Sequence, residues 1–501
     1  MRLLSLKRQL QKALYIAVLI GFVSGVNASD MPPNIVIILA DDLGWNDVGY
    51  HGSEIRTPNI DRLAAEGIVL ERFYAQATCT PTRAALLSGK SPQSLGIYQP
   101  FSKLIPTGLP LTERLLPEYL QDLGYQTALV GKWHLGFREA AYHPLSRGFE
   151  HFYGNVTGGV GFWDHVHGGG LDWQRNGATR REEGYATHLS IKEIERVISQ
   201  RDPQKPLFLY ASFNAPHLPN EAPSEAIESY SAIEDPNRRV HAAMVTELDT
   251  AIGRLITRLE QEGMLSNTLI WFMSDNGGLN ASAMPPGFVG FSRFLERWFD
   301  TPFKPGLLEF IRTNSLDGGS DNGHLKRGKG SVFEGGVRVP SVVHWPAHLD
   351  PHSHSSMVTV LDVVPTLLQV ASSHRSSGTN YGLDGSDRWL ALKEKSEIPV
   401  NDYFVSGGDG EAYYRFPWKL IDKTGGELEL FNVLSDPSEN ENLASRFPKQ
   451  LEELEEALKR AEREESIHVP LLKAFWDMDF FGGEEDRPPW SELTEPSVDS
   501  R

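Results

Sequence analysis

A single cysteine is the first candidate for chemistry in this chain of 501 residues. It opens the run Cys79-Thr80-Pro81-Thr82-Arg83, in which a proline close behind a threonine predicts the start of a helix. The unpaired N–H groups of a helix N-terminus bind anions, and Arg83, one turn further on, can reach the same anion. The alternative is that Cys79 is a small buried residue without chemistry.

Polar residues also follow four apolar segments of the chain. The segments 33–42, 125–136, 206–217 and 268–278 end in Asp41 and Asp42, in Lys132 and His134, in His217, and in Asp275 and Asn276, respectively. Each segment has the composition of a buried strand, and ligands bind beyond the carboxyl ends of parallel strands. Each aspartate alone is more easily explained as a cap or turn residue, but the four oxygen-bearing residues together favour one site.

The order of the elements predicts the fold class. Helical patterns at 57–67, 111–124 and 238–263 lie between the apolar segments, which indicates an α/β fold with a mostly parallel sheet. From about residue 391, four short strand patterns and a charged helical pattern at 447–465 predict a smaller antiparallel α+β subdomain. We therefore predict a catalytic domain over 29–390 and a C-terminal subdomain over 391–501 that ends in a loose tail.

Composition and the N-terminal segment limit which partners and which cellular compartment are possible. The formal net charge of −18 argues against nucleic-acid binding, which needs clustered lysine and arginine. Residues 1–28 combine a basic start, an apolar run and small residues before Ala28, the pattern of a cleaved signal peptide. We expect a periplasmic or secreted protein with no membrane segment in its mature form; an uncleaved membrane anchor is the alternative.

The run from Cys79 to Arg83, followed by a small apolar helix and Ser-Gly, resembles the signature of the formylglycine-dependent sulfatases. The likeness extends from Pro33 to about Asn442 and is closest to the N-acetylgalactosamine-4-sulfatase (arylsulfatase B) branch. It implies an alkaline-phosphatase-like fold, with a large mixed, mostly parallel sheet sandwiched by helices. It also implies that a formylglycine-generating enzyme converts Cys79 into formylglycine (3-oxoalanine). One hydroxyl of the hydrated aldehyde then attacks sulfur, and the other releases sulfate.

The same resemblance assigns roles to the other motif residues. It implies one calcium ion held by Asp41, Asp42, Asp275 and Asn276 together with the modified Cys79, a set that suits a hard cation. Arg83 and Lys132 would neutralise charge at the nucleophile, and His134 would assist its hydroxyl. His217 and Lys329, the latter in the run RGKG, would hold the sulfate and the bridging oxygen, one of them protonating the leaving group.

Two further segments bear on substrate choice. Residues 279–326 form an insertion longer than the family pattern, either a surface helix or a lid over the site. Residues 151–185 are rich in aromatic and basic side chains, the kind that stack on sugars and pair with sulfates. From that segment we predict substrate contacts by His165, His167 and Arg175.

The combined prediction is a sulfatase that hydrolyses sulfate esters of a carbohydrate, a sulfated galactan or glycosaminoglycan-type glycan. Three alternatives remain: an aryl sulfatase of small substrates, a phosphonate or phosphodiester hydrolase of the same superfamily, and an inactive glycan-binding relative. The second would more often have Asp-His where this chain has Asp275-Asn276. The intact motif around Cys79 argues against the third.

Overall fold

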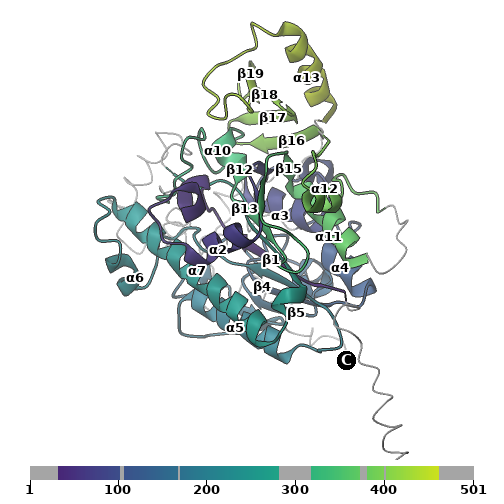
Figure 1. The fold of residues 1–501 in the computed structure, drawn as a ribbon. Coiled ribbons are helices and arrows are strands. Elements are labelled where there is room, and N and C mark those ends of the chain that lie inside the picture. The colour runs from purple at the N-terminus through teal and green to yellow at the C-terminus, as the bar shows by residue number, and fades with distance from the viewer. Residues whose placement is uncertain are drawn as a thin grey trace, which may run out of the picture. The chain divides into compact units, whose positions relative to one another are not determined.

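The computed structural model has a mixed sheet of ten strands at its centre (Figure 1). In spatial order the strands are β14 (His352–His354), β2 (Ile68–Leu70), β13 (Ser341–His344), β11 (Thr268–Ser274), β1 (Asn34–Ala40), β10 (Leu207–Ser212), β4 (Gln126–Gly131), β5 (His151–Gly154), β8 (Gln174–Arg175) and β9 (Ala178–Thr179). Strands β11, β1, β10, β4 and β5 run parallel, while β13, β8 and β9 pair antiparallel with their neighbours. The predicted mostly parallel sheet is confirmed.

The structure describes residues 32–101, 107–167, 170–280, 318–372, 381–399 and 402–461. The predicted signal peptide, residues 281–317 of the predicted insertion, and the predicted tail lie outside these ranges. The described residues from Pro33 onward form one compact unit. The predicted division at residue 390 stays a prediction.

Strand β1 shows how the sheet is buried on both faces. Ile35, Ile37 and Leu39 belong to one apolar core and Val36 and Ile38 to the other, as the two-residue period of a strand requires. The first core contains residues of α3 (Cys79–Ser88), α4 (Leu116–Asp122), α11 (Val363–Ser372) and α12 (Trp389–Glu394). The second contains residues of α2 (Pro58–Glu66), α5 (Ala186–Gln200) and α7 (Pro236–Gln261). Helices therefore cover both faces (Figure 1).

The smaller C-terminal sheet is antiparallel, as predicted. It consists of β16 (Asp402–Gly407), β17 (Gly410–Arg415), β18 (Trp418–Lys423) and β19 (Glu427–Asn432), and α13 (Pro448–Ala461) follows it. On one face, Leu420 and Leu430 pack with Leu454 of α13. On the other face, Ala412 and Ile421 join the core that contains α3. The small sheet thus shares apolar packing with the side of the large sheet that α3 covers.

The remaining elements are short. One small sheet consists of β12 (Arg338–Val339), β3 (Phe73–Tyr74) and β15 (Val358–Thr359). Another pairs β6 (Val166–His167) with β7 (Gly170–Leu171). Two further short helices are α6 (Ser224–Glu228) and α10 (Glu334–Val337).

One predicted helix begins later than expected. The helix predicted over 111–124 starts at Leu116, because Leu115 has an extended backbone (φ −104°, ψ 157°) and Pro117 follows at the beginning of the helix. Proline is compatible with a first helical turn, but in a helix interior it removes a hydrogen bond and disfavours the helical conformation of the residue before it. Residues 111–115 are therefore not part of α4.

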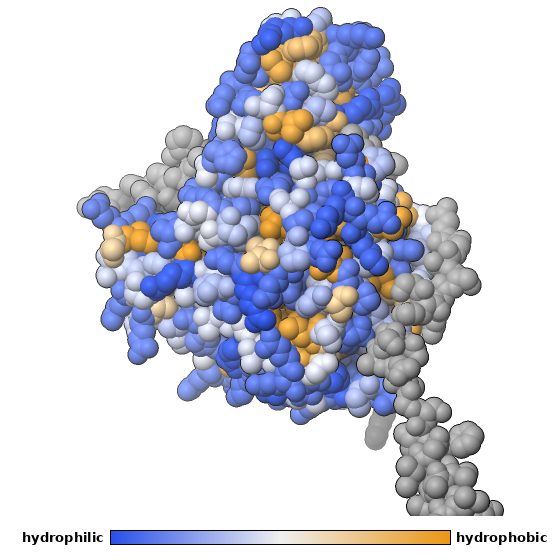
Figure 2. Space-filling view, viewed as in Figure 1, coloured by the Kyte–Doolittle hydropathy of each residue, from blue (hydrophilic) through white to orange (hydrophobic). Residues whose placement is uncertain are grey.

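The surface matches the charged composition. The face visible in Figure 2 is mostly hydrophilic, with apolar residues in small scattered groups. A helix with the length and apolar character of a membrane span does not occur in the part of the chain that the structure describes.

The packing of α13 leads to a stability prediction. Leu454 is fully buried, so Leu454→Ala should lower the free energy of unfolding by about 2–5 kcal/mol through lost burial and a residual cavity. The matched control is Leu434→Ala, because Leu434 is 51% exposed and its loss should stay within about 0.5 kcal/mol. Urea unfolding of both variants, followed by circular dichroism, measures the difference. Equal losses would show that α13 is not packed as described.

Candidate active site

The polar residues that follow four neighbouring strands meet at one edge of the sheet. Strands β11, β1, β10 and β4 are adjacent and parallel, so their carboxyl ends lie together. After β1 the backbone turns sharply, with Asp42 at φ 67°, and its N–H donates to Asp275 Oδ1 (3.2 Å). Asn276 Nδ2 donates to Asp42 Oδ1 (2.8 Å). The pairs Asp41-Asp42 and Asp275-Asn276, predicted from separate motifs, are therefore in direct contact.

Three cations compensate these carboxylates. Lys132 Nζ donates to Asp41 Oδ2 (2.7 Å), and Lys329 Nζ donates to Asp42 Oδ2 (2.7 Å). Arg83 donates through Nε and a terminal nitrogen to Asp275 Oδ2 (3.0 and 2.8 Å). Asp41, Asp42 and Asp275 are at most 2% exposed. The three carboxylates are thus buried together with Arg83 and Lys132, while the side chain of Lys329 is 16% exposed.

Burial and neighbouring charges separate the two carboxyls that follow β1. Burial and the nearby Asp275 raise the pKa of Asp41 to about 8, against the opposing effect of Lys132. Burial also acts to raise the pKa of Asp42, but Lys329 and His217 outweigh it and hold that pKa below its ordinary value. Asp42 is therefore the firmly ionised member of the pair.

Cys79 lies at the start of α3 and faces His134. The sulfur is 3.3 Å from His134 Nδ1, and Cys79 is 2% exposed. His134 Nε2 is 2.9 Å from the carbonyl oxygen of Phe101, so Nε2 carries the hydrogen and Nδ1 is left as an acceptor toward the sulfur. Burial, with Lys132 nearby, lowers the pKa of His134 well below its ordinary value, so the ring is neutral. Burial raises the pKa of the Cys79 thiol.

His217 and Lys329 converge on Asp42 from two different segments. His217 Nε2 lies 3.6 Å from Asp42 Oδ2, the oxygen that also accepts from Lys329. Its Nδ1 is 2.6 Å from the carbonyl oxygen of Leu218, which fixes Nδ1 as the donor. Nε2 therefore points into the cluster, and burial lowers the pKa of the ring.

A glycine pair that the sequence analysis did not single out also borders the site. A Cβ placed on Gly158 would lie 2.6 Å from two ring atoms of His134, and one on Gly159 would lie 3.3 Å from His217 Cε1. The backbone therefore passes directly against both histidines. The signal in the sequence was the pair of adjacent glycines, which indicates a close approach of backbone to another group.

The three predicted substrate residues have different surroundings. His167 lies near His217, because both rings approach Gly159. A Cβ added to Gly159 would lie 3.3 Å from His217 Cε1 and 3.7 Å from His167 Nδ1. His165 instead stacks on Trp173 (ring centroids 4.7 Å apart) and is 1% exposed. Arg175 pairs with Glu193 through two nitrogens (3.1 and 2.8 Å). These contacts favour structural roles for His165 and Arg175, so of the three predicted residues we retain only His167.

The strand-end cluster has features of a cation site. Asp41 Oδ1 and Asn276 Oδ1 are buried acceptors to which no residue in the described ranges donates a hydrogen bond. Asp41, Asp42 and His217 each place a potential ligand atom within 4.8 Å of the others. Carboxylate and amide oxygens are ligands for hard cations such as Ca²⁺. The oxygen-bearing residues present therefore fit the expected ion, and Asp41, Asp42, Asp275 and Asn276 would supply its oxygen donors.

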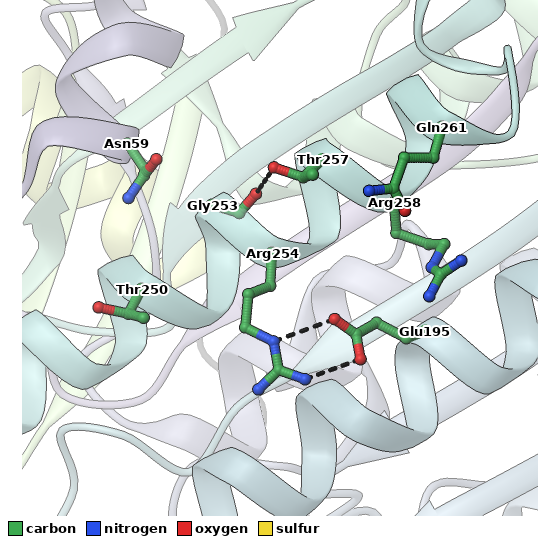
Figure 3. A pocket seen from close by; sticks show the side chains of 8 residues that line it. All are labelled: Asn59, Glu195, Thr250, Gly253, Arg254, Thr257, Arg258 and Gln261. Carbon is green, nitrogen blue, oxygen red and sulfur yellow. Dashed lines mark hydrogen bonds and ion pairs between the residues drawn. The ribbon is translucent and has the colours of Figure 1, made fainter.

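A hollow between helices is a separate surface feature (Figure 3). Arg254 of α7 donates to both carboxylate oxygens of Glu195 of α5 (3.0 and 2.7 Å), so each side chain has its charge compensated. The lining residues all come from helices, and none follows a strand of the sheet: Asn59, Glu195, Thr250, Gly253, Arg254, Thr257, Arg258 and Gln261. We assign this hollow no role in the chemistry.

Comparison with known proteins agrees with this geometry. The family model described as Sulfatase matches residues 33–373. Arylsulfatase J of Mus musculus is 31% identical over 84% of this chain and 74% of its own, and N-acetylgalactosamine-6-sulfatase of Sus scrofa is 32% identical over 76% and 70%. The crystal structure of Ps i-CgsB in complex with k-i-k-neocarrahexaose superposes with a TM-score of 0.76 at 28% identity, over 90% of this chain and 98% of that one.

The fold and the site define a hydrolase of sulfuric esters. The chain belongs to the sulfatase family. The predicted alkaline-phosphatase-like fold is confirmed, while these relatives leave the branch within the family undecided.

The close contact of Gly158 with His134 predicts a position-specific loss of activity. Gly158→Ala should lower kcat by about tenfold or more, because the added methyl must displace the imidazole of His134 from Cys79. Gly159→Ala is the matched control, since its methyl meets no atom closer than 3.3 Å and a smaller loss is expected. Steady-state kinetics on an aryl sulfate, with melting curves of both variants, provides the comparison. An equal effect of the two substitutions would contradict the described position of the loop.

Proposed function

We propose that this enzyme is a carbohydrate sulfatase that acts through formylglycine formed from Cys79 and through one calcium ion. The observation that best supports this proposal is the position of Cys79. It begins a buried helix, lies 3.3 Å from an imidazole acceptor, and is followed four residues later by an arginine bound to the acidic cluster. This arrangement suits a nucleophile that attacks next to a cation.

The side chains around position 79 would prepare the nucleophile. A hydrated formylglycine supplies one hydroxyl to attack sulfur and a second hydroxyl whose deprotonation releases sulfate. His134 Nδ1 is placed to accept a proton from such a hydroxyl, because the carbonyl of Phe101 holds the hydrogen on Nε2. Asp41, Asp42, Asp275 and Asn276 would hold the calcium ion, which supplies a positive charge toward the sulfate oxygens.

Two residues that contact Asp42 would bind and protonate the leaving group. Lys329 and His217 both reach Asp42 Oδ2, from the segments that follow β11 and β10. The ammonium of Lys329 can donate a hydrogen bond to the bridging ester oxygen, whereas Nε2 of the neutral His217 ring would first have to take up a proton. One of the two would donate the proton that the departing alcohol needs. A sugar alkoxide is a poor leaving group, so this protonation matters more for a glycan sulfate than for an aryl sulfate.

The carbohydrate assignment rests on the relatives. One relative is named for N-acetylgalactosamine, and one structural neighbour was crystallised with k-i-k-neocarrahexaose. We propose a sulfated galactan or glycosaminoglycan-type glycan as the substrate, with His167 at its binding site. We also propose export to the periplasm or beyond, and maturation by a formylglycine-generating enzyme.

Replacement of Cys79 tests the nucleophile. Cys79→Ala should reduce sulfate release from sulfated galactan oligosaccharides to the uncatalysed level, because no hydroxyl or aldehyde hydrate remains to attack sulfur. Ion chromatography of released sulfate is the measurement, and Thr82→Ser on the same helix is a control that leaves the nucleophile in place. Activity of Cys79→Ala equal to that of the native enzyme would reject the proposed mechanism. Hydrolysis of aryl sulfates alone by the native enzyme would reject the carbohydrate substrate.

Removal of calcium tests the cation. Dialysis against a calcium chelator should abolish sulfate release and lower the melting temperature, since a ligand that binds only the folded protein stabilises it. Addition of Ca²⁺ should restore both. In Asp275→Asn, which lacks one donor charge, half-maximal restoration should need more Ca²⁺. Full activity in a preparation shown by elemental analysis to be free of metal would contradict this part of the proposal.

A further inference from the structure

The segment that carries Lys329 is irregular and contacts the chain both near Asn276 and near Cys79. It extends from Lys326 to Phe333, immediately before α10. The N–H of Lys329 donates to the carbonyl of Gly278 (3.1 Å), just beyond Asn276. The N–H of Gly330 donates to the carbonyl of Ala77 (2.8 Å), two residues before Cys79. The position of this segment therefore determines where the ammonium of Lys329 lies relative to the nucleophile and the acidic cluster.

The turn between β16 and β17 forms hydrogen bonds with the middle of this segment. Asp409 in that turn accepts hydrogen bonds from the hydroxyl of Ser331 (2.5 Å) and the N–H of Val332 (2.9 Å). The N–H of Gly408 donates to the carbonyl of Gly330 (2.7 Å). Residues 330–332 are therefore held by polar contacts from the C-terminal sheet, directly beside Lys329.

A buried ion cluster fixes the two ends of the segment. Lys419 of β18 is fully buried and donates to Glu334 Oε1 (3.2 Å) and Glu439 Oε1 (2.6 Å). Glu439 in turn accepts from the N–H of Glu334 (2.7 Å), and its carbonyl accepts from Lys326 Nζ (3.0 Å). Lys326 precedes Lys329 by three residues and Glu334 begins α10, so the cluster holds the segment on both sides of Lys329.

Apolar packing also attaches the small sheet to the rest of the chain. Ala412 and Ile421 already pack in the core shared with α3. Buried ion pairs contribute little net stability, because desolvation offsets their attraction. Their geometry instead restrains where the segment can lie, and a misplacement of about 1 Å at a catalytic group can lower a rate by about a hundredfold.

We propose that the C-terminal sheet positions Lys329 for catalysis, with Asp409 and Lys419 as positioning residues that do not touch the substrate. This inference rests on the proposed role of Lys329 at the bridging oxygen. It gives the small sheet a function in the reaction beyond its share of the core. Asp409 is the better residue to test, because it is only partly buried whereas Lys419 lies inside a charged cluster.

The test compares two aspartates of the same hairpin. Asp409 lies in its turn, and Asp402 lies at its open end, where it pairs with Arg415 (2.6 Å) and is 39% exposed at the side chain. Asp409→Ala, Asp402→Ala and Lys329→Ala are assayed on a sugar sulfate and on a 4-nitrophenyl sulfate. Rates are normalised to the formylglycine content at position 79 and to the folded fraction. Asp409→Asn keeps an acceptor for Val332 and serves as the conservative variant.

Asp409→Ala should reproduce the pattern of Lys329→Ala in weaker form. We expect kcat on the sugar sulfate to fall about tenfold, a smaller loss on the aryl ester, and near-normal rates for Asp402→Ala and Asp409→Asn. A general loss of structure would lower the rates on both substrates by the same factor. Two outcomes would overturn the inference. One is that Asp409→Ala lowers the rates on the sugar sulfate and on the aryl ester equally, and the other is that its rates match those of Asp402→Ala. If Lys329→Ala itself keeps native rates, the proposed role of Lys329 fails instead.

Discussion

The site depends on mutual compensation between buried charges. Three carboxylates (Asp41, Asp42 and Asp275) and three cations (Arg83, Lys132 and Lys329) form one cluster, buried except for part of Lys329. Each pair joins different segments of the chain. Leaving one such charge without its partner costs several kcal/mol. The cluster is therefore stable only when the ends of β1, β4 and β11, the helix that begins at Cys79, and the segment containing Lys329 are all in place.

This balance also explains how an acidic protein can bind an anionic ester. The chain has a formal net charge of −18, so its overall field repels a sulfated glycan. When Asp41 is ionised, as a bound divalent cation would favour, the three side-chain cations balance the three carboxylates. The bound cation would then leave the pocket with an excess of positive charge. In our account, the sulfate group is attracted by this local excess and not by the protein as a whole.

Much of this arrangement was accessible from sequence because it rests on local patterns. Apolar runs that end in Asp41 or Asp275 predicted strand ends, and the parallel sheet brings those ends together. The surroundings of His165 were not accessible, because its stacking on Trp173 depends on tertiary packing. The contacts of Asp409 with residues 331 and 332 join positions more than 70 residues apart, and no periodicity marks them.

The central claim is that Cys79 is not a thiol in the working enzyme. Mass spectrometry of the peptide that contains Cys79 tests it most directly, on preparations made with and without a co-expressed formylglycine-generating enzyme. Our account predicts an aldehyde, and its hydrate, in place of the thiol, with specific activity proportional to the converted fraction across preparations. A fully active enzyme in which Cys79 is entirely an unmodified thiol would contradict it.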